Sequence, residues 1–233
     1  MRQLLRKHKN IVKDEIKLIT YYQPQSYITE QYRLLKNNIQ FSSVDKEIKT
    51  IVVTSPEPAD GKTTTSANLS IVLAQQGKRV ILVDSDLRKP SVHYSFNISN
   101  LHGLTNVLTR EISLENAILK THIHNLEVLT SGPIPPNPSE LLESKAMELL
   151  IYQLHSGFDY VVFDTPPILA VSDSQILANK CDGVIMVVSS GKTRKDAALK
   201  SKNILLQANA RLIGVVMNGI EQKRREDYYQ YGP

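Results

Sequence analysis

The sequence has little cysteine and no long apolar run, and each shortage excludes a class of protein. Its single cysteine, Cys181, excludes an internal disulfide and favours a reducing, cytosolic setting. Because Cys181 stands just before a strand-like run, we expect a packed core thiol there rather than a nucleophile. No apolar run is long enough to span a bilayer, and no segment near residue 1 resembles a signal peptide. These shortages predict a soluble, cytoplasmic protein.

The chain also lacks a strong excess of either charge. Its 233 residues carry a net charge of +5, which permits contact with nucleic acid or an anionic membrane but argues for neither. Residues 1–25 begin with a basic stretch, and we expect them to form a solvated arm. An arm that rests on acidic lipid or on a partner fits the same charges. The length and a hydrophobic content of 41% suit one large domain.

Apolar runs alternate with helix-like stretches along most of the chain. The strand-like runs cover 51–55, 79–86, 125–132, 159–167, 183–190 and 211–218. The helix-like stretches cover 27–41, 63–76, 139–156, 173–180 and 193–208, and Gly77 is expected to cap the helix at 63–76. Several strands are apolar without alternation, which is typical of strands covered by helices on both faces. The pattern predicts a doubly wound α/β domain over residues 26–220, with a mostly parallel sheet.

Residues 54–65, TSPEPADGKTTT, follow a strand-like run, open a helix and contain Gly-Lys-Thr, the end of a phosphate-binding loop. The usual pattern G-x-x-x-x-G-K-[ST] has glycine where this chain has Pro56. That change leaves the backbone donors of residues 59–63 intact, so strand, loop and helix still predict a nucleotide site. The residues expected at the nucleotide are Pro58, Ala59, Asp60, Gly61, Lys62, Thr63 and Thr64. Lys62 is expected to reach the outer phosphates, and the Thr63 hydroxyl to ligate Mg²⁺.

Three aspartates follow two other predicted strands. Asp84 and Asp86 end the run VILVDSD, and Asp164 ends the run DYVVFD. Ligands of an open α/β sheet bind at the carboxyl ends of its strands, so these carboxylates are expected beside the loop. A Mg²⁺ ion that bridges phosphates takes one or two carboxylates and waters. Capping of turns explains any one of these aspartates, but it explains all three poorly.

The loop and the two aspartate segments together resemble P-loop ATPases with a second aspartate motif on a strand. Partition ATPases of this group carry a signature lysine where this chain has Glu57. The bacterial tyrosine kinases of capsule and exopolysaccharide synthesis fit better. Their loop pattern T-S-x-x-P-x-x-G-K-[ST] is matched by Thr54, Ser55, Pro58, Gly61, Lys62 and Thr63, and their D-x-D-x-R by Asp84, Asp86 and Arg88. The stretches 102–108, HGLTNVL, and 135–142, PPNPSELL, also resemble that family.

Two outlying segments agree with the resemblance. The family carries E-x-x-R-x-x-R on an early helix, used for subunit contacts in a ring, and Glu30, Arg33 and Lys36 stand at these positions. Lysine at the last position keeps the charge but loses the planar fork of arginine. The family also ends in a tyrosine cluster, and the tail 221–233 carries Tyr228, Tyr229 and Tyr231. The resemblance implies that these tyrosines accept phosphate, in trans within the ring.

The resemblance further implies an ATP- and Mg²⁺-dependent protein tyrosine kinase. Its catalytic residues here are Lys62, Asp84 and Asp86, with Asp84 accepting or orienting the tyrosine proton, and its metal ligands are Thr63, Asp86 and Asp164. Asn218 is a candidate for contact with adenine, although a structural role fits almost as well. The implied partners are further copies of the chain, protein tyrosine substrates and a separate membrane-spanning activator, which recruits the chain to the inner face of the membrane. No nucleic acid is expected.

Two other functions stay open at this point. A nucleotide switch of the partition or cell-division type fits the loop and aspartates equally well, but Glu57 and the tyrosine tail argue against it. A scaffold whose site has degenerated at Pro56 is the third possibility. Arg88 and Lys89 fit contact with phosphates or with a neighbouring subunit, and the sequence does not choose between these.

Overall fold

The computed structural model describes residues 18–42 and 47–220. The first seventeen residues and the tyrosines at 228, 229 and 231 lie outside them. Seven strands form one sheet in the order β3-β4-β2-β5-β1-β6-β7, and every neighbouring pair is parallel except β3 with β4. The strands are β1 (Thr50–Thr54), β2 (Val80–Asp84), β3 (Leu119–Lys120), β4 (Leu126–Leu129), β5 (Tyr160–Asp164), β6 (Gly183–Ser189) and β7 (Leu212–Asn218).

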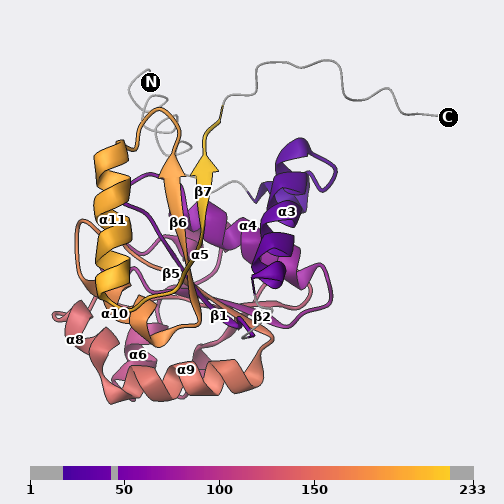
Figure 1. The fold of residues 1–233 in the computed structure, drawn as a ribbon. Helices are drawn as coiled ribbons and strands as arrows, with labels where there is room; N and C mark the ends of the chain where they lie inside the picture. Colours follow the sequence, from indigo (N-terminus) through magenta and orange to yellow (C-terminus); the bar gives the residue numbers. More distant parts are fainter. Residues whose placement is uncertain (1–17, 43–46, 221–233) are drawn as a thin grey trace, which may run out of the picture.

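Helices cover both faces of this sheet. They are α2 (Ile19–Tyr22), α3 (Tyr27–Phe41), α4 (Lys62–Ala74), α5 (Val92–Phe96), α6 (Leu104–Leu108), α7 (Leu114–Ala117), α8 (Pro138–Glu143), α9 (Lys145–Gly157), α10 (Asp173–Lys180) and α11 (Lys195–Gln207). Figure 1 shows α3 and α11 on opposite sides of β6 and β7.

The side chains of the central strands alternate between two cores. Ile51 and Val53 of β1 pack with α3, α4 and α5, whereas Val52 packs with the helices of the other face. All three are fully buried, as expected for a parallel strand between two helical layers. The predicted doubly wound α/β fold with a mostly parallel sheet is confirmed.

Most predicted elements occur within a few residues of their expected bounds. The short helices α2, α5, α6 and α7 were not predicted, and other details also differ. The helix expected over 139–156 is two helices, because Ser144 ends α8 in an extended conformation and caps α9 by accepting from the Met147 N–H. The two-residue β3 is too short to give a periodic signal. Gln75 rather than Gly77 caps α4, and Gly77 follows in the left-handed region with φ +79°.

The structure bears on two further expectations, which concern the single cysteine and the lack of a long apolar run. The Cys181 side chain packs against the second core, and burial raises the pKa of its thiol to about 12, as suits a packing residue rather than a nucleophile. Within 18–42 and 47–220, none of the helices combines the length and the apolar character needed to cross a membrane.

The strand order decides which segments meet. Strand β5 lies between β1 and β2, with Asp164 level with Asp84 in the register. Strand β6 flanks β1 on the other side, and β7 follows it at the edge. The carboxyl end of β1, which leads into the loop 55–61, therefore has both aspartate segments on one side and the ends of β6 and β7 on the other.

Gly103 marks a close approach within the segment HGLTNVL. At the start of α6, a β-carbon on Gly103 would lie 2.1 Å from the Thr130 carbonyl oxygen and 2.4 Å from the Gly132 nitrogen. Both atoms belong to the backbone after β4, where the Leu104 N–H donates to the Thr130 carbonyl at 2.7 Å. The backbone itself must move to admit a side chain here, so this position requires glycine.

We expect Gly103→Ala to lower the free energy of unfolding by about 3 kcal/mol, because backbone cannot yield as a flexible side chain does. Gly157→Ala is the matched control, since a β-carbon on Gly157 meets nothing within 4 Å in the described chain. Urea denaturation of both variants measures the difference. Equal stabilities for the two would show that the contact at Gly103 is not the constraint we infer.

Candidate active site

The loop between β1 and α4 has the shape that its sequence predicts. Ala59 and Gly61 are its residues with positive φ, at 61° and 97°. Gly61 also has no room for a side chain, because a β-carbon would lie 2.0 Å from the Asn218 amide nitrogen. Position 56 is outside the left-handed region, so it does not need glycine. Pro56 is buried, and its carbonyl accepts from the Leu169 N–H, so the loop accommodates the proline.

The residues predicted to surround the nucleotide are distributed along this loop and the first turn of α4. Pro58 and Ala59 are exposed, Asp60 and Thr63 are buried, and Gly61, Lys62 and Thr64 are intermediate. The Asn218 amide donates to the Asp60 carbonyl at 3.0 Å. Asn218 thus holds the loop, which favours the structural role among the two that its sequence position allowed.

Lys62 and the three predicted carboxylates converge at the carboxyl edge of the sheet. The Lys62 Nζ lies 3.6 Å from Asp86 Oδ2. Asp84 Oδ2 accepts from the backbone N–H groups of Ser91 and Val92, both at 3.0 Å. Asp164 Oδ1 accepts from the Ser66 hydroxyl at 3.0 Å. Four groups from α4, β2, the loop after β2, and β5 therefore form one charged cluster.

The cluster places three carboxylates close together in the protein interior. Asp84 and Asp164 are fully buried, and Asp86 is 4% exposed. Burial and the neighbouring Asp164 raise the pKa of Asp84, against the two backbone donors that lower it. Burial also raises the pKa of Asp164, against the attraction of Lys62. Repulsion of this kind favours a bound cation.

The donors present fit magnesium rather than a metal held by protein alone. Asp164 Oδ2 is buried and has no hydrogen-bond partner among the described residues. The Thr63 hydroxyl is close enough to Asp164 to lower the pKa of that carboxyl, and it lies 3.4 Å from the Ser91 hydroxyl. No group of three His, Cys, Asp or Glu side chains in the described ranges could hold an ion alone. An ion here needs hydroxyl, phosphate or water ligands as well, as Mg²⁺ usually has.

Several residues that position the cluster are not evident from the motifs. Ser66 supports Asp164, and the backbone after Pro90 supports Asp84. Arg88 Nε donates to the buried Asp173 at 2.9 Å, and Ser139 donates to the same carboxylate at 2.6 Å. The Arg88 guanidinium therefore ties the loop after β2 to α8 and α10. This contact within the chain is neither of the two that the sequence suggested for Arg88.

The three predicted contact residues on α3 are not equivalent. Arg33 pairs with Glu30 and also donates to the Pro24 carbonyl at 3.0 Å, on an exposed part of the helix. Lys36 is 5% exposed, and burial, with Arg33 nearby, lowers the pKa of its amine. In a single copy of the chain, Glu30 and Arg33 are therefore the members of the motif that remain accessible.

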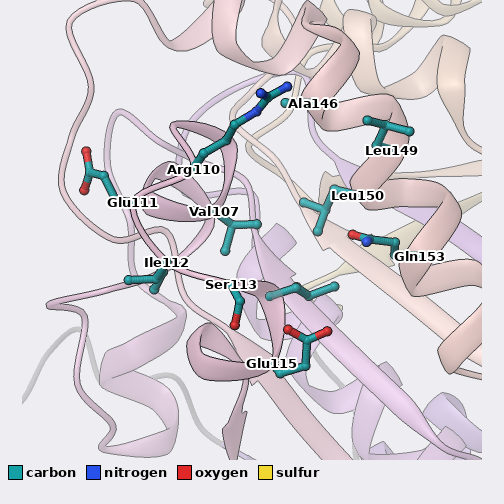
Figure 2. A pocket seen from close by; sticks show the side chains of 11 residues that line it. Val107, Arg110, Glu111, Ile112, Ser113, Glu115, Ala146, Leu149, Leu150 and Gln153 are labelled. Carbon is teal, nitrogen blue, oxygen red and sulfur yellow. The ribbon is translucent and has the colours of Figure 1, made fainter.

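An apolar cavity of about 480 Å³ lies between α3 and the end of β7. It reaches Thr65 in the first turn of α4 and Asn218 at the end of β7, and its apolar walls include Tyr32, Leu35 and Val216. A second cavity of about 450 Å³ lies between the segment 107–115 and α9, as Figure 2 shows. The second cavity has none of the predicted site residues in its lining and is separate from the site.

Comparisons with known proteins agree with this geometry. Residues 48–207 match the family described as an AAA domain. Tyrosine-protein kinase YwqD of Bacillus subtilis is 50% identical over 215 residues, which are 92% of this chain and 91% of that protein. The chimerical protein CapA2B2 superposes with a TM-score of 0.85 at 41% identity, over 88% of this chain and 90% of that one. The kinase domain of Escherichia coli tyrosine kinase ETK superposes with a TM-score of 0.86 at 31% identity, over 95% of this chain and 86% of that one.

Proteins of the cell-division type, the alternative function, match this chain with lower identity and a lower TM-score. The septum site-determining protein MinD of Pyrococcus horikoshii superposes with a TM-score of 0.63 at 23% identity, over 72% of this chain and 69% of that one. A likeness at this identity shows the P-loop fold alone, so the comparisons favour the kinase. With half of its residues shared with a named kinase over nine-tenths of both chains, the chain belongs to the family of bacterial tyrosine-protein kinases.

Proposed function

We propose that this kinase binds ATP with Mg²⁺ and transfers the γ-phosphoryl group to tyrosine hydroxyls, including its own Tyr228, Tyr229 and Tyr231. The observation that carries the proposal is the meeting of Lys62 with Asp84, Asp86 and Asp164 at one edge of the sheet. Phosphoryl transfer is catalysed chiefly by positioning and by charge stabilisation, and this cluster offers both.

Each residue of the cluster has a role that its contacts support. Lys62, held near Asp86, neutralises charge on the phosphoryl oxygens during transfer. Asp84, fixed by two backbone N–H groups, accepts or orients the tyrosine proton, and its raised pKa lies closer to that of a phenol. Thr63, Asp86 and Asp164 would hold magnesium, which when bound supplies positive charge to bridge the phosphates. The loop from Pro58 to Thr64 binds phosphates through its backbone.

The nucleoside would occupy the cavity between α3 and the end of β7. This cavity adjoins the helix that carries Lys62 and Thr63, and its lining is mostly apolar, with Asn218 and Thr65 at the side of the loop. A few polar groups within an apolar wall are typical of nucleoside sites. In this arrangement Asn218 acts on the loop and lines the cavity at the same time.

We place the kinase domain at 26–220, between a basic arm at 1–25 and a phosphate-accepting tail at 221–233. Copies of the chain associate in a ring through the face of α3 that carries Glu30 and Arg33, supported by Lys36. A separate membrane-spanning protein activates the kinase in the cytoplasm, at the inner face of the membrane. The motifs that resemble those of the kinases of capsule and exopolysaccharide synthesis support a role in the synthesis of capsule or a related polysaccharide.

Phosphotyrosine formation with ATP and Mg²⁺ tests this function directly. We expect Lys62→Met to reduce phosphotyrosine formation by about a hundredfold, because the positive charge that stabilises the transferring phosphoryl group is lost. Changing Tyr228, Tyr229 and Tyr231 together to Phe should abolish most autophosphorylation yet leave phosphorylation of an added tyrosine peptide intact. ATP hydrolysis without phosphotyrosine, even with an activator segment present, would instead indicate a switch ATPase.

The pH dependence of stability tests the crowding of the carboxylates. Burial, opposed by Lys62, raises the pKa of Asp164 to about 6. As pH rises from about 4, the usual pKa of an unfolded aspartate, the unfolded chain releases its proton first, so the ligand-free folded protein loses stability up to about pH 6. Asp164→Asn avoids this loss. We expect it to stabilise the protein above pH 6 by an amount on the order of 2 kcal/mol, and to change little at pH 4.

Calorimetric unfolding at pH 4 and pH 7.5 measures this difference, with Asp196→Asn on the exposed start of α11 as the control. Added ATP and Mg²⁺ should stabilise the parent protein more than Asp164→Asn, because the variant has lost a metal ligand. A variant with the same effect at both pH values would contradict the proposed charge crowding.

A further inference from the structure

Lys192 reaches the phosphate-binding loop from a different part of the chain. It lies in the turn between β6 and α11, 134 residues beyond Pro58, and its Nζ donates to the Pro58 carbonyl at 2.6 Å. The same nitrogen is 3.6 Å from Asp60 Oδ1. The roles assigned above do not use this lysine, and its side chain is 47% exposed.

Asp60 forms an ion pair with the amine of Lys192. Its carboxylate is fully buried, and Oδ2 accepts from the Glu57 N–H at 3.0 Å across the loop. Oδ1 has no hydrogen-bond partner in the described part of the chain, and the cation paired with it is Lys192. A buried carboxylate needs such a partner, because an uncompensated charge in the interior is strongly unfavourable.

The hydrogen bond from Lys192 to the Pro58 carbonyl also fixes the orientation of the peptide group between Pro58 and Ala59. In a planar trans peptide, the carbonyl of one residue and the N–H of the next point to opposite sides. The Pro58 carbonyl points toward Lys192, so the Ala59 N–H points away from Lys192. In the same way, the Asp60 carbonyl points toward Asn218, and the Gly61 N–H points away from it. Ala59 is the loop residue other than glycine that has a positive φ, and outside contacts stabilise the backbone in this less favoured conformation.

The turn that presents Lys192 is itself rigid. The Thr193 N–H donates to the Ser189 carbonyl at 2.9 Å, and the Thr193 hydroxyl accepts from the Ser189 N–H at 2.7 Å. The Ser190 N–H donates to the Asn218 carbonyl at 2.8 Å. The turn of Lys192, just after β6, and Asn218, at the end of β7, are therefore connected by a backbone hydrogen bond, and the two side chains donate to the Pro58 and Asp60 carbonyls of the loop.

We propose that Lys192 is a positioning residue that orients the loop for nucleotide binding before the nucleotide arrives. The inference rests on the proposed nucleotide function. It predicts that Lys192 affects ATP and ADP alike, because it acts on the loop rather than on the γ-phosphate. A lysine that leaves the loop to touch the γ-phosphate would affect ATP alone.

Isothermal titration of the full chain with ATP and with ADP, both with Mg²⁺, tests the proposal. We expect Lys192→Met to raise both dissociation constants about tenfold, as loss of a charge-assisted hydrogen bond does. Lys192→Arg should keep both within about threefold of the parent, since it retains the charge and the donors. Lys195→Met, on the exposed start of α11 three residues away, is the matched control and should bind as the parent does.

Kinase assays separate positioning from general damage. At saturating ATP, Lys192→Met should recover to within about threefold of the parental rate while its KM for ATP is raised. Parental affinity for both nucleotides in Lys192→Met would overturn the proposal, as would weaker binding of ATP alone. Failure of the parent protein to bind either nucleotide would refute the proposed function itself, which sets that failure apart from failure of the inference.

Discussion

Three aspartates buried at the carboxyl edge of a parallel sheet are the constraint on which the rest of this site depends. Their mutual repulsion is offset within the protein by Lys62 and by backbone and hydroxyl donors around Asp84 and Asp164. The arrangement holds because each acid stands on, or just after, a strand whose register is fixed by two buried neighbours. The repulsion that remains would be relieved by a bound cation. The same three carboxylates therefore affect both the stability of the fold and the function of the site.

The phosphate-binding loop shows a second kind of dependence. Its sequence departs from the common pattern at Pro56, yet the residues with left-handed backbone are at 59 and 61. Side chains from outside the loop donate to its carbonyls: Lys192 to that of Pro58, and Asn218 to that of Asp60. A conformation that the loop residues favour only weakly is thus held by tertiary contacts. Position 56 is not one of the left-handed positions, so the glycine there can be lost without loss of the loop's shape.

The sequence was enough to predict the fold class, the loop and the three carboxylates. Strands β2 and β5 end in Asp84 and Asp164, and the helix after Gly61 begins within one residue of the expected position, because these signals are local in the chain. The division of one predicted helix at Ser144 was missed, although a serine three residues before the donor Met147 is a recognisable cap. The family followed from motifs of the same local kind.

The sequence by itself therefore determined which residues could do chemistry, since strand ends, glycine positions and motif spacing are properties of short segments. Only the tertiary structure decided how they are held. The order of strands placed β5 between β1 and β2, and contacts across 134 and 85 residues brought Lys192 to Pro58 and Arg88 to Asp173. Gly103 belongs with these, because its need for glycine comes from the backbone after β4 and not from its own φ. Such pairings depend on packing between distant elements, and no periodicity within a single segment encodes them.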